Sequence, residues 1–178
     1  MPPIHIRPAT EQDLPAISAI YNDAVLTTTA TYDYATEGLE RRQAWFRDHV
    51  ELGLPMFVGE DPIAGIIGWS SLSPYHRRPG FRFTVENSIY VHAEHRGRGL
   101  GGRLLEPLIR EAARLRLHSI IAAIDASNEA SLRLHQRWGF AEVGRFREVG
   151  FKFDRWLDVA YLQLLIPPET ASGQKAGG

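Results

Sequence analysis

Arg96-Gly97-Arg98-Gly99-Leu100-Gly101-Gly102 is the stretch that decides how this chain folds. Its glycines permit positive backbone φ angles and let the main chain come close to a ligand. The residues before it, 81–92, carry apolar side chains typical of a strand, and leucines recur at helical spacing from 100 to 115. A glycine turn between a strand and a helix favours an anion, because free N–H groups and the helix dipole both attract negative charge.

The turn by itself does not identify the ligand. Arg96 and Arg98 would add charge-assisted hydrogen bonds to a pyrophosphate. The stretch is close to the dinucleotide fingerprint G-x-G-x-x-G, but Asp125 lies too far along for its acidic partner, and the P-loop's Gly-Lys-Ser/Thr is missing. An NAD(P)-binding enzyme and a tight loop without any ligand are the weaker alternatives.

The rest of the chain predicts one α/β domain over residues 1–166, followed by a flexible tail at 167–178 that is rich in Pro, Gly and Ala. The order of elements is β-α-α-β-β-β-α-β-α-β-β, with a βαβ unit around the glycine turn in a mixed sheet. Thr10 and Asp13 predict a helix start, and Gly53 and Gly139 predict helix ends. The expected strands are 4–7, 56–60, 63–69, 81–92, 119–124, 141–146 continuing at 149–153, and 156–166, and the expected helices follow Asp13, Thr36, Gly102 and Asn128.

Bulk properties exclude several classes of protein. A net charge of −1 over 178 residues gives no basic face for nucleic acid. The absence of cysteine excludes disulfides, thiolate nucleophiles and cysteine-ligated metals. The start lacks the apolar core of a signal peptide, and no apolar run reaches the roughly 18 residues of a membrane span, so we expect a cytoplasmic protein. His92 and His95 show no metal-ligand spacing with a carboxylate partner, so we expect no metal.

Two separated motifs resemble one family. Arg96-x-x-Gly99-x-Gly101, placed after the strand Ile89-Tyr90-Val91, resembles motif A of the GCN5-related N-acetyltransferases (GNAT). The segment from Asn128 to Phe140 is similar to the Asn-x-x-(Ala/Ser) to Gly-Phe segment of that family. The resemblance implies a GNAT fold, with a central mixed, mostly antiparallel sheet flanked by helices, and acetyl-CoA as co-substrate.

The resemblance also implies how acetyl-CoA is held. The amides of the turn, Arg96, Gly97, Arg98, Gly99, Leu100, Gly101 and Gly102, would bind the pyrophosphate. Main-chain groups of Ile89, Tyr90 and Val91, with the side chains of Asn128 and Ser131, would bind the pantetheine arm. The Val91 amide is also the candidate for polarising the thioester carbonyl. Asn128 is equally suited to capping its helix alone.

A narrower resemblance points to the acceptor. Residues 84–92, 131–135 and 150–158 resemble the phosphinothricin and methionine sulfoximine acetyltransferase branch. Members acetylate the α-amino group of small amino acid analogues and are commonly homodimers, so we expect a homodimer and a link to herbicide or antibiotic resistance. Acetylation of another amine or a protein N-terminus, and a non-catalytic acyl-CoA-binding module, are the alternatives.

Direct attack by the amine suits a chain without cysteine, and it requires a base and an acid. Glu86 is the expected general base, acting directly or through a water. His135 stands where many family members carry a tyrosine that protonates the leaving thiolate, with Tyr90 and Tyr161 as other donors. The alternatives are a paired strand carboxylate for Glu86 and a core or surface histidine for His135.

An amino acid substrate also carries a carboxylate, which an arginine fork binds well. The nearest arginines to Glu86 are Arg77, Arg78 and Arg82, and we expect at least one of them to bind it. Phe81 and Phe83 are expected in the core. The remaining predicted substrate contacts are Thr31, Asn87 and Ser88.

Overall fold

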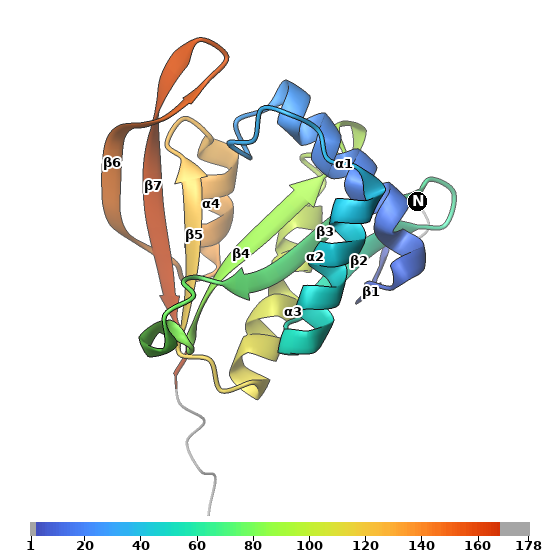
Figure 1. Cartoon of the computed structure of the whole chain (residues 1–178), viewed down its shortest axis with the longest axis horizontal. Helices are drawn as coiled ribbons and strands as arrows, with labels where there is room; N and C mark the ends of the chain where they lie inside the picture. Colours follow the sequence, from blue (N-terminus) through green and yellow to red (C-terminus); the bar gives the residue numbers. More distant parts are fainter. Residues whose placement is uncertain (1–2, 168–178) are drawn as a thin grey trace, which may run out of the picture.

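A computed structural model describes residues 3–167 of the chain, so the predicted tail, Pro167 apart, lies outside the described residues. The order of helices and strands matches the prediction (Figure 1). The elements are β1 (His5–Pro8), η1 (Glu11–Asp13), α1 (Leu14–Thr27), α2 (Leu39–Leu52), β2 (Met56–Asp61), β3 (Gly65–Pro74), η2 (Pro79–Phe81), β4 (Thr84–Val91), η3 (Ala93–His95), α3 (Leu100–Arg114), β5 (Ser119–Asp125), α4 (Glu129–Arg137), β6 (Ala141–Lys152) and β7 (Arg155–Leu165).

The strands form one mixed sheet in the order β1-β2-β3-β4-β5-β7-β6. Among the strands of residues 3–167, only β4 and β5 pair in parallel, and the other neighbours are antiparallel. The βαβ unit β4–α3–β5 is therefore confirmed, as is the mixed, mostly antiparallel sheet. Among the described residues, no helix combines the length and apolar character needed to cross a membrane.

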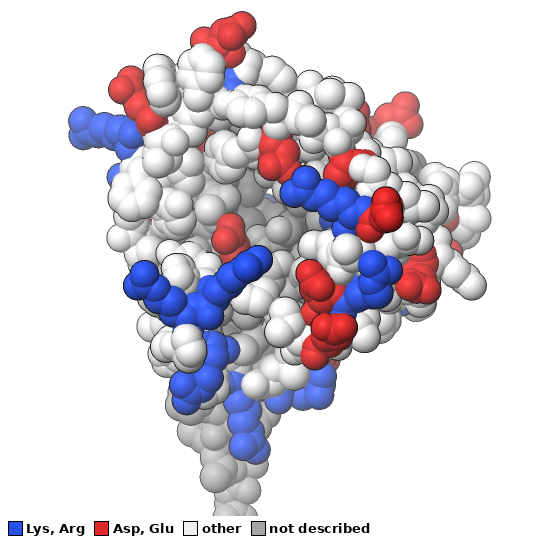
Figure 2. Space-filling model, viewed as in Figure 1, with Lys and Arg blue, Asp and Glu red and all other residues white. Residues whose placement is uncertain are grey.

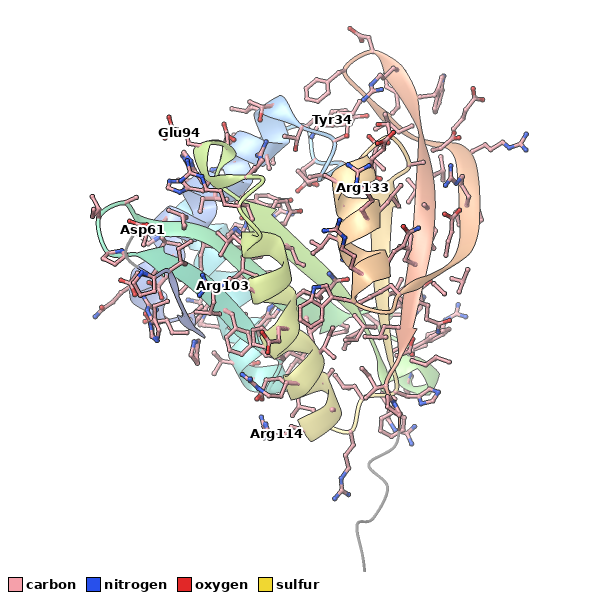
Figure 3. All side chains as sticks on the ribbon, turned by 180° about the vertical axis from the view of Figure 1, so that it is seen from behind. Tyr34, Asp61, Glu94, Arg103, Arg114 and Arg133 are labelled. Atoms are coloured by element: carbon pink, nitrogen blue, oxygen red, sulfur yellow. The ribbon has the colours of Figure 1, made fainter. Side chains whose placement is uncertain are left out.

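Helices cover both faces of the sheet. Apolar side chains of α1 pack with Trp69 of β3 and Tyr90 of β4 on one face. Leucines of α3, with Leu132 and Leu134 of α4, pack with Val85 of β4 on the other face. Figure 3, seen from behind, shows α3 with Arg103 and Arg114 and α4 with Arg133 on this second face. We call these the α1/α2 face and the α3/α4 face.

The predicted helix ends are confirmed by their geometry. The Asp13 carboxylate accepts a hydrogen bond from the Thr10 N–H at 2.8 Å, and it also binds Arg7 of β1. Gly53 ends α2 with φ of 65°, and Gly139 follows α4 with φ of 86°. These left-handed conformations are the ones that favour glycine after a helix.

The predicted course of the chain before β4 is wrong in two places. β3 runs on to Pro74 instead of ending at Trp69, because Ser70 is buried and its hydroxyl donates to the Leu104 carbonyl at 3.0 Å. Phe81 and Phe83 lie outside the core, with exposed fractions of 40% and 46%. Phe81 belongs to η2 in the β3–β4 connection, and Phe83 lies under the Arg82 guanidinium at 4.3 Å.

Candidate active site

A split between β4 and β5 opens a cleft in the sheet. The two strands pair only where Thr84, Val85 and Glu86 oppose Ser119, Ile120 and Ile121. Beyond Glu86 they diverge, and a cleft of about 770 Å³ is lined by residues 86–91 of β4 and 122–125 of β5. A hollow on the α1/α2 face is visible in Figure 2, with basic side chains gathered below it. Main-chain groups that the split leaves without a strand partner can bind an extended ligand.

Most of the predicted site residues line this one cleft. The cleft is also walled by the α1–α2 loop, the glycine turn and α4. Arg98 and the three arginines 77, 78 and 82 are exposed and do not line it. The predicted residues that do line it are Thr31, Glu86, Asn87, Ser88, Ile89, Tyr90, Val91, Arg96, Gly97, Gly99, Leu100, Gly101, Gly102, Asn128, Ser131 and His135.

The glycine turn has the backbone conformation that the sequence predicts. Gly97 and Gly99 have φ of 75° and 78°, and Leu100 begins α3 directly after them. Arg96 donates from Nε to the Val91 carbonyl at 3.0 Å, which ties the turn to the end of β4. The N-terminus of α3 therefore opens into the cleft, where its free N–H groups suit a phosphate.

Gly101 and Gly102 also have a packing role that sequence reasoning missed. A Cβ at Gly101 would lie 2.9 Å from the Leu134 side chain, and one at Gly102 would lie 3.1 Å from Trp138 Nε1. Both residues therefore let α3 approach α4 closely, in addition to lining the cleft. The resemblance to a phosphate loop drew attention to the ligand and not to this helix contact.

Glu86 faces the α1/α2 side of the cleft. It opposes Ser73 of β3, whose hydroxyl contacts His49 of α2 at 3.0 Å. Burial raises the pKa of the Glu86 carboxyl. A carboxylate whose pKa is raised binds a proton more tightly than an exposed one, which suits a general base.

Asp125 is a second carboxylate of this region that sequence reasoning did not assign to the site. It ends β5, is buried, and accepts hydrogen bonds from the Ser127 N–H and hydroxyl, both at 2.9 Å. Burial disfavours its charge, but hydrogen bonds from Thr29 and Ser127 outweigh this and lower the pKa of Asp125. Burial, with the nearby charges of Asp125 and Glu86, raises the pKa of Tyr32 to about 12. The α1/α2 side thus carries two carboxyl groups, of which Asp125 also lies 3.9 Å from the guanidinium of Arg155.

The α1–α2 loop forms the cleft wall opposite these carboxyl groups. Side chains of β4 and β6 hold the loop in place by hydrogen bonds. Lys152 of β6 is 2% exposed, and its Nζ donates to the carbonyls of Thr28 and Thr31 at 2.8 and 2.7 Å. Tyr90 of β4 donates to the Ala30 carbonyl at 3.2 Å. Burial lowers the pKa of Lys152. Sequence reasoning missed Lys152, because 121 residues separate it from Thr31.

Asn87 and His135 meet on the α3/α4 side. Asn87 Nδ2 lies 2.9 Å from His135 Nε2, and His135 Nδ1 lies 2.8 Å from the Ser131 carbonyl. The exposed fractions of Asn87 and His135 are 8% and 4%. Burial lowers the pKa of His135, which favours the neutral imidazole. Asn128 caps α4 by accepting from the Ser131 N–H at 3.1 Å, as the sequence predicts.

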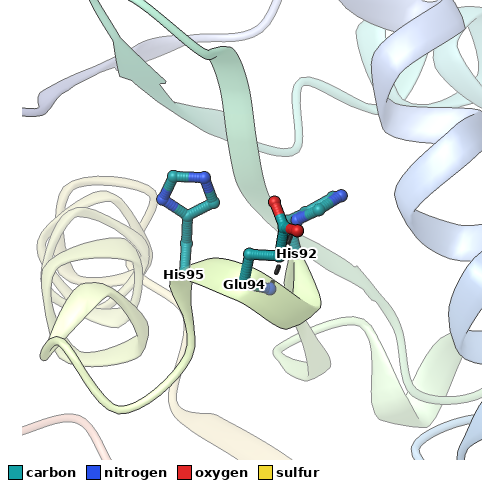
Figure 4. Close-up of side chains that lie close together, drawn as sticks. All are labelled: His92, Glu94 and His95. Atoms are coloured by element: carbon teal, nitrogen blue, oxygen red, sulfur yellow. Dashed lines mark hydrogen bonds between the residues drawn. The ribbon is translucent and has the colours of Figure 1, made fainter.

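A group of possible metal ligands lies at η3, beside the cleft. Ligand atoms of His92, Glu94 and His95 lie within 4.8 Å of one another. Glu94 is exposed, and Figure 4 shows it between His92 and His95. Sequence reasoning overlooked Glu94 as a carboxylate partner of the two histidines. That the chain binds no metal stays a prediction.

Comparisons with known proteins agree with this geometry. The acetyltransferase (GNAT) domain family matches residues 4–141. L-methionine sulfoximine/L-methionine sulfone acetyltransferase of Pseudomonas aeruginosa is 45% identical over 92% of this chain and 95% of its own. The crystal structure of a GNAT superfamily phosphinothricin acetyltransferase from Sinorhizobium meliloti in complex with acetyl-CoA has a TM-score of 0.90 at 33% identity, covering 98% of this chain and 94% of that one.

A third relative has a different acceptor in its name. The crystal structure of ribosomal-protein-alanine N-acetyltransferase from Brucella melitensis has a TM-score of 0.88 at 43% identity, covering 90% of this chain and 99% of that one. All three relatives cover nearly the whole fold, and the family match spans both motifs of the cleft. The chain therefore belongs to the GCN5-related N-acetyltransferase (GNAT) family and is an N-acetyltransferase that uses acetyl-CoA.

Proposed function

We propose that this enzyme acetylates the α-amino group of a small amino acid analogue of the methionine sulfoximine, methionine sulfone or phosphinothricin type. The observation that carries the proposal is Glu86, a half-buried carboxyl with a raised pKa at the α1/α2 side of the cleft. The names of two relatives support the substrate class. Asp125 and Glu86 together favour a substrate that arrives as an ammonium ion.

The residues divide the work of a direct transfer. Acetyl-CoA supplies an activated acetyl group. Glu86 takes a proton from the ammonium, directly or through a water, so that the free amine attacks the thioester carbonyl. The Val91 N–H is the proposed donor to the carbonyl oxygen. The carbon–sulfur bond breaks, and the thiolate takes a proton, for which His135, Tyr90 and Tyr161 stay the predicted donors.

Binding of the substrate carboxylate is assigned to the loop between β3 and β4. Arg77, Arg78 and Arg82 are all exposed there, next to η2 and before β4. Since none of them lines the cleft in this structure, the arginine that binds would have to swing its side chain toward Glu86. Arg82 and Arg77 stay the predicted partners.

A thiol-release assay tests the acceptor. L-methionine sulfoximine, L-methionine sulfone and phosphinothricin are compared with peptides that begin with alanine, all at saturating acetyl-CoA. We expect the amino acid analogues to react and the peptides to be poor substrates. Reaction of the peptides alone would overturn the proposal and favour the second candidate, acetylation of a protein N-terminus, which the Brucella melitensis relative supports.

We also propose that the enzyme is a homodimer. Apolar side chains stand exposed on the β6–β7 hairpin, where Phe146 is 58% and Trp156 is 62% exposed. Exposed apolar surface of this kind marks contact sites. Light scattering coupled to size exclusion should give twice the 20.0 kDa chain mass. The cytoplasmic location and a role in resistance stay predictions from the sequence.

A further inference from the structure

Asn87 lines the cleft and carries a buried hydrogen-bond acceptor without a partner in the described part of the chain. Its side chain is more than nine-tenths buried and lines the cleft next to Glu86 and Ser88. Among the described residues, Asn87 Oδ1 has no hydrogen-bond partner, although its Nδ2 contacts His135. Leaving a buried carbonyl oxygen without a hydrogen-bond donor costs free energy. The unpaired Oδ1 therefore indicates a ligand that supplies a donor.

The orientation of the Asn87 amide follows from the helix behind it. The Ser131 carbonyl can only accept, so His135 Nδ1, at 2.8 Å from it, carries the proton. In the neutral imidazole, Nε2 then has no hydrogen and accepts from Asn87 Nδ2 at 2.9 Å. The amide cannot flip without placing Oδ1 against the lone pair of Nε2. The Ser131 carbonyl of α4 thus fixes the tautomer of His135. That tautomer in turn binds Asn87 Nδ2 and leaves Asn87 Oδ1 without a partner among residues 3–167.

The position of Asn87 indicates which ligand supplies the hydrogen. Asn87 opposes Leu72 of β3, which belongs to the core under α3, and its partner His135 lies on α4. Side chains of successive strand residues point to opposite faces, so Glu86 faces the α1/α2 side and Asn87 the α3/α4 side. The glycine turn opens at the N-terminus of α3 on the same side as Asn87. The pantetheine arm of acetyl-CoA carries two amide N–H groups, whereas the acceptor amine belongs on the Glu86 side.

We propose that Asn87 Oδ1 accepts a hydrogen bond from an amide N–H of the pantetheine arm, and that His135 is a positioning residue that holds the Asn87 amide in this orientation. The inference rests on acetyl-CoA as co-substrate and not on the identity of the acceptor. It replaces the predicted role of His135 as proton donor, because its Nε2 carries no proton to give, and leaves Tyr90 and Tyr161 as the predicted donors to the thiolate.

Calorimetry of acetyl-CoA binding without an acceptor tests the hydrogen bond. Asn87→Leu, which keeps the approximate size, should raise the Kd roughly tenfold through the lost bond. The ligand is changed in parallel, with acetyl-CoA analogues in which one or the other arm amide N–H is replaced by an ester oxygen. One analogue should bind the wild-type protein roughly tenfold more weakly than acetyl-CoA, yet bind Asn87→Leu as well as acetyl-CoA does.

The same measurement has clear contrary outcomes. If both analogues are weakened equally in wild type and Asn87→Leu, the N–H does not come from the arm. If instead the KM of the amine rises and the Kd of acetyl-CoA does not, Asn87 serves the acceptor, and the inference is overturned. Gln163→Leu removes an amide of β7 that contacts Ser119 at 2.9 Å and does not line the cleft, so it should leave the Kd unchanged.

The positioning role of His135 has its own readout. Nitrogen-15 NMR of the wild-type protein should show His135 as the neutral tautomer with the proton on Nδ1. His135→Ala should weaken acetyl-CoA binding about as much as Asn87→Leu, and the double variant should be no weaker than either single one. A proton on Nε2, or additive losses in the double variant, would overturn the positioning role even if His135→Ala folds poorly.

Discussion

Glu86 and Asn87 are neighbours on β4, yet they face opposite sides of the split sheet. On the α1/α2 side, Glu86 and Asp125 form an acidic region in which burial raises the pKa of Glu86. On the α3/α4 side, Asn87, Asn128 and His135 offer neutral hydrogen-bonding groups. The two sides differ in the charge they attract, so one strand can serve a cationic acceptor on one face and a neutral amide arm on the other.

The split between β4 and β5, more than any single residue, organises the site. β4 and β5 stay paired up to Glu86 and Ile121 and separate immediately afterward. Glu86, the proposed base, therefore lies at the point where the two strands part. We expect an acceptor on one face and acetyl-CoA on the other to meet there.

Removal of the proposed base, Glu86, should give the largest effect of these changes, and only on the α1/α2 side of the cleft. Glu86→Gln should lower kcat by roughly 10²- to 10⁴-fold, the usual contribution of a general base. Acetyl-CoA binding should not change, because we propose that its arm lies on the Asn87 side. Steady-state kinetics with calorimetry checks both values. A kcat within twofold of wild type would remove Glu86 from the mechanism.

The pH profile should show the titration of the same carboxyl. Because burial raises the pKa of Glu86, the base is protonated and inactive over a wider acidic range than an exposed glutamate. In the wild type, kcat/KM should fall as pH falls through this raised pKa. Glu86→Gln should lose that limb of the profile, and an unchanged limb would assign the titration to another group.

Lys152→Met should disturb the α1/α2 side of the cleft and leave the α3/α4 side unchanged. Methionine fills a similar volume but leaves the Thr28 and Thr31 carbonyls without their donor, at a cost of about 1–3 kcal/mol. We expect a lower free energy of unfolding in urea and a higher KM for the amine, with the Kd of acetyl-CoA unchanged. Tyr34→Phe is the milder control, because it removes an exposed hydrogen bond from the same loop to the Phe151 carbonyl. Weaker acetyl-CoA binding in Lys152→Met would contradict the division between the two sides.

Gly99→Ala should have the smallest effect and act on the acetyl-CoA side. Nothing lies within 4 Å of an added Cβ, so the cost comes from φ of 78°, about 1–2 kcal/mol. Acetyl-CoA binding should weaken while the KM of the amine stays near wild type. Gly80→Ala adds the same methyl group in open space without a positive φ and should cost little. Equal losses in the two variants would show that the backbone conformation is not the cause.

Local sequence signals predicted most of the fold and most of the cleft lining. The glycine turn, the Asn128 cap and the apolar periodicity are each contained within a few residues. Asp125 and Lys152 were missed as site residues because their roles depend on contacts with the distant α1–α2 loop. Phe81 and Phe83 were misplaced because an apolar strand pattern does not show where pairing ends.

A crystal structure with acetyl-CoA and L-methionine sulfoximine bound would show both faces of the site at once. We expect the pantetheine arm in the split between residues 87–91 and 122–125, with an arm amide on Asn87 Oδ1. We expect the amine of the acceptor on the α1/α2 side, in contact with Glu86 directly or through one water. An acceptor amine on the Asn87 side, or an arm that bypasses the split, would contradict this division between the two faces.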